Sequence, residues 1–104
     1  VDIEFMLPSC VPATPFDDSG AVIDGDLTKE LLSKYDFKGL GEMMNSVGVV
    51  NCDEDIMKKL DCDCIKDGHA PMLEGKALNA YVCGGISNDH ECSNEKEALE
   101  KVSA

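Results

Sequence analysis

Short apolar runs alternate with amphipathic stretches along the whole chain. The apolar runs predict three strands, at residues 3–7, 37–40 and 62–66, and Ile86 indicates a short fourth strand. Helical spacing of apolar residues predicts four helices, at residues 27–35, 52–60, 74–83 and 94–102. Four strand–helix units in about a hundred residues are typical of an α/β fold with a parallel sheet and right-handed crossovers.

Polar residues mark where the predicted helices begin and end. Asp26 is placed to cap the first helix, and Ser93 the last. Asn51 and Glu54 match the cap and third positions of a capping box before the second helix. Gly84 and the glycine after it provide a suitable end for the third helix.

Two connections have unusual length or composition. Residues 9–25 form a long segment rich in Pro, Ser, Asp and Gly, and long loops in compact domains are often functional. Residues 43–50 are expected to form an apolar loop. Because a (β/α)₈ barrel needs roughly 250 residues, residues 1–104 are expected to form one domain equivalent to about half of such a barrel.

Charge and hydrophobicity exclude several classes of partner. The chain carries 21 acidic residues against nine lysines, has no arginine, and has a formal net charge of −12. Nucleic-acid binding and attachment to an anionic membrane surface are therefore not expected. No apolar stretch approaches the roughly 18 residues of a membrane span, and the first residues lack a signal peptide's positive charge. These observations favour a cytoplasmic protein.

Six cysteines leave three interpretations open. We expect reduced, partly buried thiols, because the chain has helical stretches and no secretory signal. An even count in a short chain is also compatible with a disulfide framework. Cys62 and Cys64, with His69 nearby, resemble a fragment of a zinc site, although such sites usually need four ligands.

Three residues with metal-binding side chains each follow an apolar run. His69 lies 27 residues after Glu42, and His90 lies 21 residues after His69, which is about one strand and one crossover helix each time. Ligands in parallel α/β folds bind at the carboxyl ends of strands. The spacing therefore predicts a metal site, whereas a surface acid and two hydrogen-bonded structural histidines remain the simpler alternative.

Other side chains are expected at the same edge of the sheet. Four residues are candidates for a substrate pocket: Ser9, Met43, Asp67 and Asp89. Met43 is also a candidate for ordinary core packing. Glu91 lies beside His90 and is a second candidate catalytic acid after Glu42.

Five longer motifs occur in one order along the chain. They are Phe-Met-Leu-Pro-Ser-Cys-Val-Pro-Ala-Thr (5–14), Gly-Leu-Gly-Glu-Met-Met-Asn (39–45), Asp-Gly-His-Ala-Pro (67–71), Gly-Lys-Ala-Leu-Asn-Ala-Tyr (75–81) and Gly-Ile-Ser-Asn-Asp-His-Glu (85–91). Together they resemble the adenine deaminases of the amidohydrolase superfamily.

The resemblance implies a (β/α)₈ barrel with two divalent transition-metal ions (manganese, iron or zinc). It implies hydrolysis of adenine to hypoxanthine and ammonia. The family's acid after the fourth strand falls on Glu42, and its histidines after the fifth and sixth strands fall on His69 and His90. A carboxylic acid would move protons during the reaction, a role for which Glu42 and Glu91 are the candidates.

Two features of the family's pattern have no counterpart in this sequence. They are the His-x-His pair of the first strand and the metal-binding Asp of the eighth strand. The chain alone is therefore expected to be inactive, and its two unpaired sheet edges are expected to favour self-association. The alternatives are a non-catalytic α/β binding or interaction module that retains barrel motifs, and a small domain stabilised by disulfides or zinc.

Overall fold

The computed structural model describes residues 1–104 and contains one four-stranded sheet. Its strands are β1 (Met6–Pro8), β2 (Gly39–Met43), β3 (Ile65–Gly68) and β4 (Asn88–Asp89), and all three neighbouring pairs are parallel. The order in the sheet, β1-β2-β3-β4, is also the order in the chain. Right-handed crossovers between such strands leave every connecting helix on one face. The predicted α/β fold is confirmed, and its topology is consistent with half of a β/α barrel.

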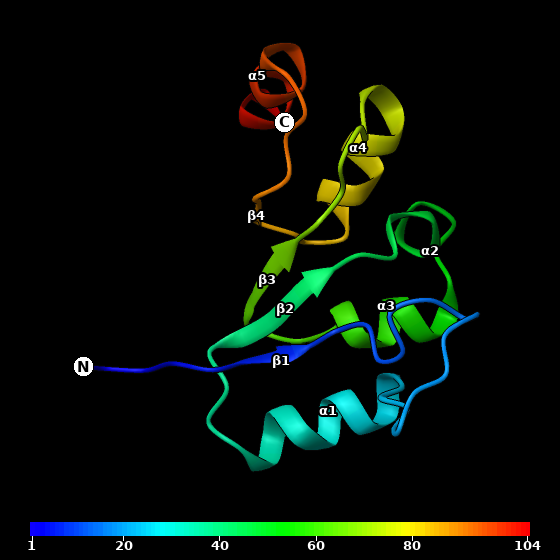
Figure 1. Ribbon diagram of the computed structural model, residues 1–104, viewed down its shortest axis with the longest axis vertical. Helices are drawn as coiled ribbons and strands as arrows, with labels where there is room; N and C mark the ends of the chain where they lie inside the picture. The colour runs from blue at the N-terminus through cyan, green and yellow to red at the C-terminus, as the bar shows by residue number, and fades with distance from the viewer.

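Five helices connect or follow the strands. They are α1 (Gly25–Lys34), α2 (Ser46–Val50), α3 (Glu54–Leu60), α4 (Gly75–Cys83) and α5 (Glu95–Ser103). Figure 1 shows α1 and α3 beside β1 and β2, whereas α4 and α5 lie toward the β3 and β4 side of the sheet. None of these helices has the length and apolar character that crossing a membrane requires.

The helix caps differ from the predicted ones by one or two residues. Asp24, not Asp26, caps α1, because its carboxylate accepts a hydrogen bond from the Leu27 amide at 2.8 Å. Asp53 caps α3 in place of Asn51. The α5 cap is one residue after the expected Ser93, at Asn94. In each case another short polar side chain nearby offers equivalent chemistry, which sequence alone does not rank.

The expectation of a loop over residues 43–50 was wrong for most of that segment. Asn45 accepts a hydrogen bond from the Gly48 amide at 2.9 Å and starts α2. A side chain at Gly48 would meet Asn45 and Ile56 at 2.8–2.9 Å, so α2 packs tightly at this point. Val49 is buried in the core. Burial of Val49 accounts for a helix too short to be stable alone.

All four strands begin two or three residues later than predicted, and β4 (Asn88–Asp89) lies just after Ile86. β2 extends to Met43 and therefore contains Glu42, which was expected to follow the strand. β3 begins at Ile65, after a bend in which the Cys62 and Cys64 sulfur atoms are 2.8 Å apart. All six cysteines are free thiols.

The hydrophobic core lies between the sheet and its helices. Its eight buried members come from β2, α2, α3, the loop after β3, α4 and the loop before β4: Leu40, Met43, Val49, Ile56, Leu60, Ala70, Tyr81 and Ile86. Gly39 permits the close approach of β2 and β3, because a β-carbon there would lie 2.2 Å from the Ile65 carbonyl oxygen. This close approach holds the amino-terminal starts of β2 and β3 together.

Candidate metal centre

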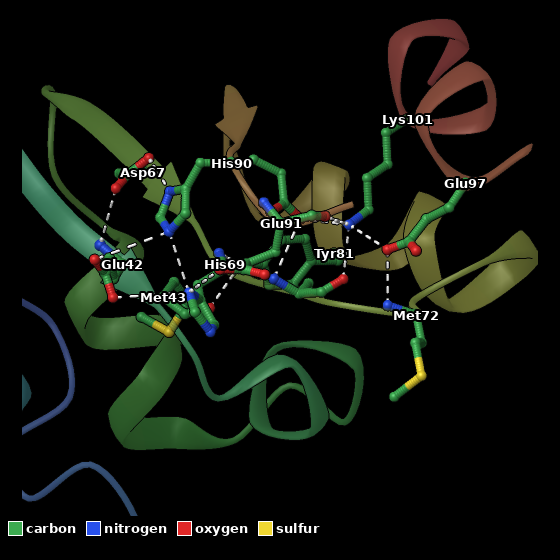
Figure 2. A network of polar contacts seen from close by, with 12 residues as sticks. Glu42, Met43, Asp67, His69, Met72, Tyr81, His90, Glu91, Glu97 and Lys101 are labelled. Atoms are coloured by element: carbon green, nitrogen blue, oxygen red, sulfur yellow. Dashed lines mark hydrogen bonds and ion pairs between the residues drawn. The ribbon is translucent and has the colours of Figure 1, made fainter. Parts of the chain in front are cut away.

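Glu42, His69 and His90 converge at the carboxyl edge of the sheet. One ligand atom from each lies within 4.8 Å of the other two. His69 Nδ1 is 3.1 Å from His90 Nε2, and it is 3.7 Å from Glu42 Oε2. Glu42 Oε1 in turn lies 3.9 Å from His90 Nε2. Figure 2 shows the three side chains pointing toward one another from β2 and from the segments that follow β3 and β4.

A local irregularity of β2 directs the Glu42 side chain. The pairing of β2 with β3 shifts register between Leu40 and Met43, and Glu42 has a φ of 35°, in the left-handed region. Such a conformation costs a non-glycine residue about 1–3 kcal/mol and is concentrated at functional sites. The Ser9 hydroxyl donates to the Glu42 carbonyl at 2.8 Å, and the Glu42 amide is 3.4 Å from Asp67 Oδ2. These contacts hold the strained residue in place.

The Asp67 carboxylate lies behind the ring of His90. Its Oδ1 lies 3.6 Å from His90 Nδ1, on the opposite side of the ring from the nitrogen that faces His69. A carboxylate there favours the tautomer with the proton on Nδ1 and leaves the Nε2 lone pair free toward Glu42 and His69. This is the usual arrangement behind a histidine that binds a metal ion.

Tyr81 joins the backbone of β2, which carries Glu42, to that of His69, the first residue after β3. Its hydroxyl donates to the Met43 carbonyl at 2.6 Å and accepts from the His69 amide at 3.0 Å. Burial raises the pKa of Tyr81 to about 12, so the hydroxyl keeps its proton at neutral pH. Tyr81 thus fixes the separation of Met43 and His69, and with them the carboxyl ends of β2 and β3.

The candidate pocket residues occupy different environments. Ser9 lines a cavity of about 230 Å³ next to Glu42, although its side chain is nearly fully buried. Met43 is fully buried in the core, and the neighbouring Met44 lines the cavity instead. Because β2 extends through residue 43, alternation along the strand turns Met43 away from Glu42.

The two acids that flank His90 have separate environments. The Glu91 carboxylate is 43% exposed and lies 4.0 Å from His69 Nδ1, within reach of a molecule bound above the histidines. Asp89 is almost buried and forms an ion pair with Lys101 at 2.9 Å. Asp89 therefore faces the protein and lies behind the site.

Sequence reasoning missed the polar network behind the histidines. Glu97 and Lys101 of α5 have side chains only 0% and 8% exposed, and they form an ion pair at 2.9 Å. In the sequence they are an ordinary i,i+4 pair on a helix, which is most often a solvent-exposed arrangement. The helical spacing of Tyr81 and Leu78 indicates that Tyr81 is buried, but nothing in the sequence indicates its hydrogen bonds.

The chain is similar over nearly its whole length to curated bacterial and archaeal proteins. An adenine deaminase of Petrotoga mobilis is 47% identical over 104 residues, which are 98% of this chain and 18% of the relative. The corresponding protein of Methanoregula boonei is 50% identical over 102 residues, which are again 98% of this chain and 18% of the relative. The adenine deaminase of Clostridium acetobutylicum is 48% identical over 106 residues, which cover 98% of this chain and 19% of the relative.

The chain is homologous to one segment of the adenine deaminases. No protein-family model matches it. The chain spans about a fifth of the length of the adenine deaminases it matches. The resemblance carried by the five motifs is therefore confirmed, and the clustered residues lie in the stretch of the chain that matches the adenine deaminases.

Proposed function

We propose that this chain supplies the central ligands of a divalent metal centre in an adenine deaminase, which converts adenine and water to hypoxanthine and ammonia. The main support is that the ligand atoms of Glu42, His69 and His90 lie within 4.8 Å of one another. Glu42 also has a strained, left-handed backbone conformation in β2. Homology to adenine deaminases along 98% of the chain supports the choice of reaction.

The donor set fits a divalent transition metal ion. Neutral imidazoles suit zinc, iron and related ions, and a carboxylate suits manganese as well. His69 through Nδ1, His90 through Nε2 and the Glu42 carboxylate would hold the ion. A metal ion at such a site lowers the pKa of a water molecule to about 7 and so supplies hydroxide near neutral pH.

Exposed carboxylates are placed to handle protons. Glu91 Oε1 lies within 4.0 Å of His69 Nδ1 and is open to solvent. It is suited to take a proton from the attacking water and to deliver it to the departing amino group. Glu42 is the other candidate for this role, because its carboxylate is also exposed. Asp67 Oδ1, 3.6 Å from His90 Nδ1, would support the ring of His90 from the side away from His69.

The chain would form part of a larger barrel. Apolar side chains along the β1 edge are exposed, with Ile3 at 71%, Phe5 at 65% and Met6 at 36%. The remaining strands of a barrel would cover these residues and contribute further metal ligands, including a His-x-His pair and an Asp. Residues 1–104 would then be about four of the eight βα units, and the chain alone would release no ammonia from adenine.

The isolated chain would also self-associate through the open sheet edges. Replacing Phe5 by lysine on the β1 edge is expected to shift the chain toward monomer in sedimentation measurements. The matched control is Phe16→Lys, since Phe16 is 96% exposed in the long loop after β1 and away from the sheet. Equal sedimentation of wild type and Phe5→Lys would contradict edge association. The predictions from the sequence that the chain binds neither nucleic acid nor a membrane, and that it is cytoplasmic, stay predictions.

Metal binding by the chain tests the proposed ligands. The metal-free chain is incubated with zinc or manganese, passed through gel filtration, and analysed for bound metal. We expect binding by wild type, and an affinity reduced about tenfold or more by Glu42→Gln and by His69→Gln. Glu30→Gln is the matched control, because Glu30 is an exposed acid on α1. Equal metal binding by Glu42→Gln and wild type, or none by folded wild type, would refute the ligand assignment.

A further inference from the structure

The two histidines are followed by loops whose backbone groups are bound by the same two side chains of α5. His69 begins the loop between β3 and α4, and His90 begins the loop between β4 and α5. Lys101 Nζ donates to the carbonyl of Ala70 at 2.8 Å and to that of Glu91 at 2.6 Å. Each acceptor is the residue directly after a histidine.

Glu97 repeats this pattern one turn earlier in α5. Its Oε1 accepts from the Met72 amide at 2.7 Å, and its Oε2 accepts from the Ser93 amide at 2.8 Å. Met72 and Ser93 are each the third residue after a histidine. The pair from α5 therefore binds equivalent positions of both loops, as Figure 2 shows in part.

Asp89 completes the set by binding two backbone amides of the same loops. Its Oδ2 accepts from the Ala70 amide at 3.2 Å, and its Oδ1 accepts from the Glu91 amide at 2.9 Å. Together with the carbonyl contacts of Lys101, the Asp89–Lys101 ion pair binds both backbone groups of Ala70 and Glu91. Lys101 is 8% exposed and Asp89 is 9% exposed, so water competes little for these contacts.

We propose that Lys101, held by Asp89 and Glu97, is a positioning residue that fixes the distance between the His69 and His90 rings. The 3.1 Å approach of their nitrogens depends on the relative position of the two loops, whose backbones Lys101 joins through the Ala70 and Glu91 carbonyls. Lys101 touches neither ring, so it acts through the backbone of the adjoining residues. This inference rests on the proposed function in treating the two rings as metal ligands.

The test compares two lysines of the same helix. Lys101→Met removes the buried ammonium, whereas Lys96→Met removes an ammonium that is 76% exposed and pairs only with Glu74. Cobalt(II) is titrated into each variant, and its visible absorption spectrum reports the number and geometry of nitrogen ligands. We expect Lys101→Met to bind cobalt about 10- to 100-fold more weakly, with a changed spectrum. Lys96→Met should match wild type.

Lys101→Arg serves as the second variant, because Lys101→Met leaves two buried carboxylates unpaired and can fail to fold. Arginine keeps the charge but replaces three tetrahedral donors by a planar fork. We expect it to fold with the wild-type circular dichroism spectrum and still to bind cobalt at least about fivefold more weakly. Wild-type cobalt affinity and spectrum in folded Lys101→Arg would overturn the proposal.

A metal-free readout separates this inference from the proposed function. In wild type, proton NMR is expected to show a contact between the His69 and His90 rings, whose centroids are 5.2 Å apart. Folded Lys101→Arg should lose or weaken that contact, and Lys96→Met should keep it. Failure of wild type to bind cobalt would refute the metal centre alone. An unchanged ring contact in Lys101→Arg would refute positioning by Lys101 whether or not metal binds.

Discussion

Replacing Tyr81 by phenylalanine removes one hydroxyl that joins two strands. The ring is 1% exposed, so the space it fills remains filled. The hydroxyl donates to the Met43 carbonyl and accepts from the His69 amide, and Tyr81→Phe leaves both of these backbone groups without that partner. Each lost hydrogen bond in a buried setting costs about 1–2 kcal/mol. The free energy of unfolding should therefore fall by about 2–4 kcal/mol.

Urea unfolding followed by circular dichroism measures this loss. Tyr35→Phe is the matched control, because Tyr35 is 53% exposed at the end of α1 and its hydroxyl has no hydrogen bond within the chain. We expect the control to stay within about 0.5 kcal/mol of wild type. If the free energy of unfolding of Tyr81→Phe also stays within about 0.5 kcal/mol of wild type, with the same slope against urea concentration, the argument that this hydroxyl joins the strand ends is refuted.

Three further perturbations test other parts of the fold. Hydrogen bonds from a backbone amide and a lysine ammonium lower the pKa of Glu97 to about 2 from its ordinary 4.5. The ionised Glu97 carboxylate therefore contributes its full stabilisation above pH 4.5, and this stabilisation is lost as the pH falls toward 2. In acid unfolding curves, the stability of Glu97→Gln should lack this part of the pH dependence. Gly39→Ala should lower the unfolding midpoint in urea by placing a β-carbon against strand β3, whereas Gly20→Ala, with no atom within 4 Å, should not. Treatment with a small disulfide reagent should join Cys62 to Cys64, whose sulfurs are 2.8 Å apart. The treated protein is then alkylated and its peptides are mapped by mass, and finding both cysteines alkylated would contradict this prediction.

The order of the elements and the edge that carries the site could be predicted from local patterns. Apolar runs and helical spacing depend on neighbouring residues, and parallel strands bring their carboxyl ends together whatever the details of packing. These two facts were enough to expect that Glu42, His69 and His90 would meet. The strained φ of Glu42 depends on the pairing of β2 with β3, which no local pattern specifies.

Features that depend on long-range packing were not accessible in the same way. The helix over residues 46–50 is too short for propensity to predict, and burial of Val49 stabilises it. Glu97 and Lys101 have the spacing of a surface ion pair, yet the loops after β3 and β4 cover them. Met43 was ambiguous between pocket and core until the extent of β2 was known.

Exchange of this segment into a relative tests the central claim most directly. The matching 104-residue stretch of the Petrotoga mobilis adenine deaminase, 47% identical to this chain, is replaced by residues 1–104, and ammonia release from adenine is measured. We predict an active chimera that loses activity with Glu42→Gln and keeps it with Glu30→Gln. A folded, metal-loaded chimera that releases no ammonia, or one in which Glu42→Gln remains fully active, would contradict the account.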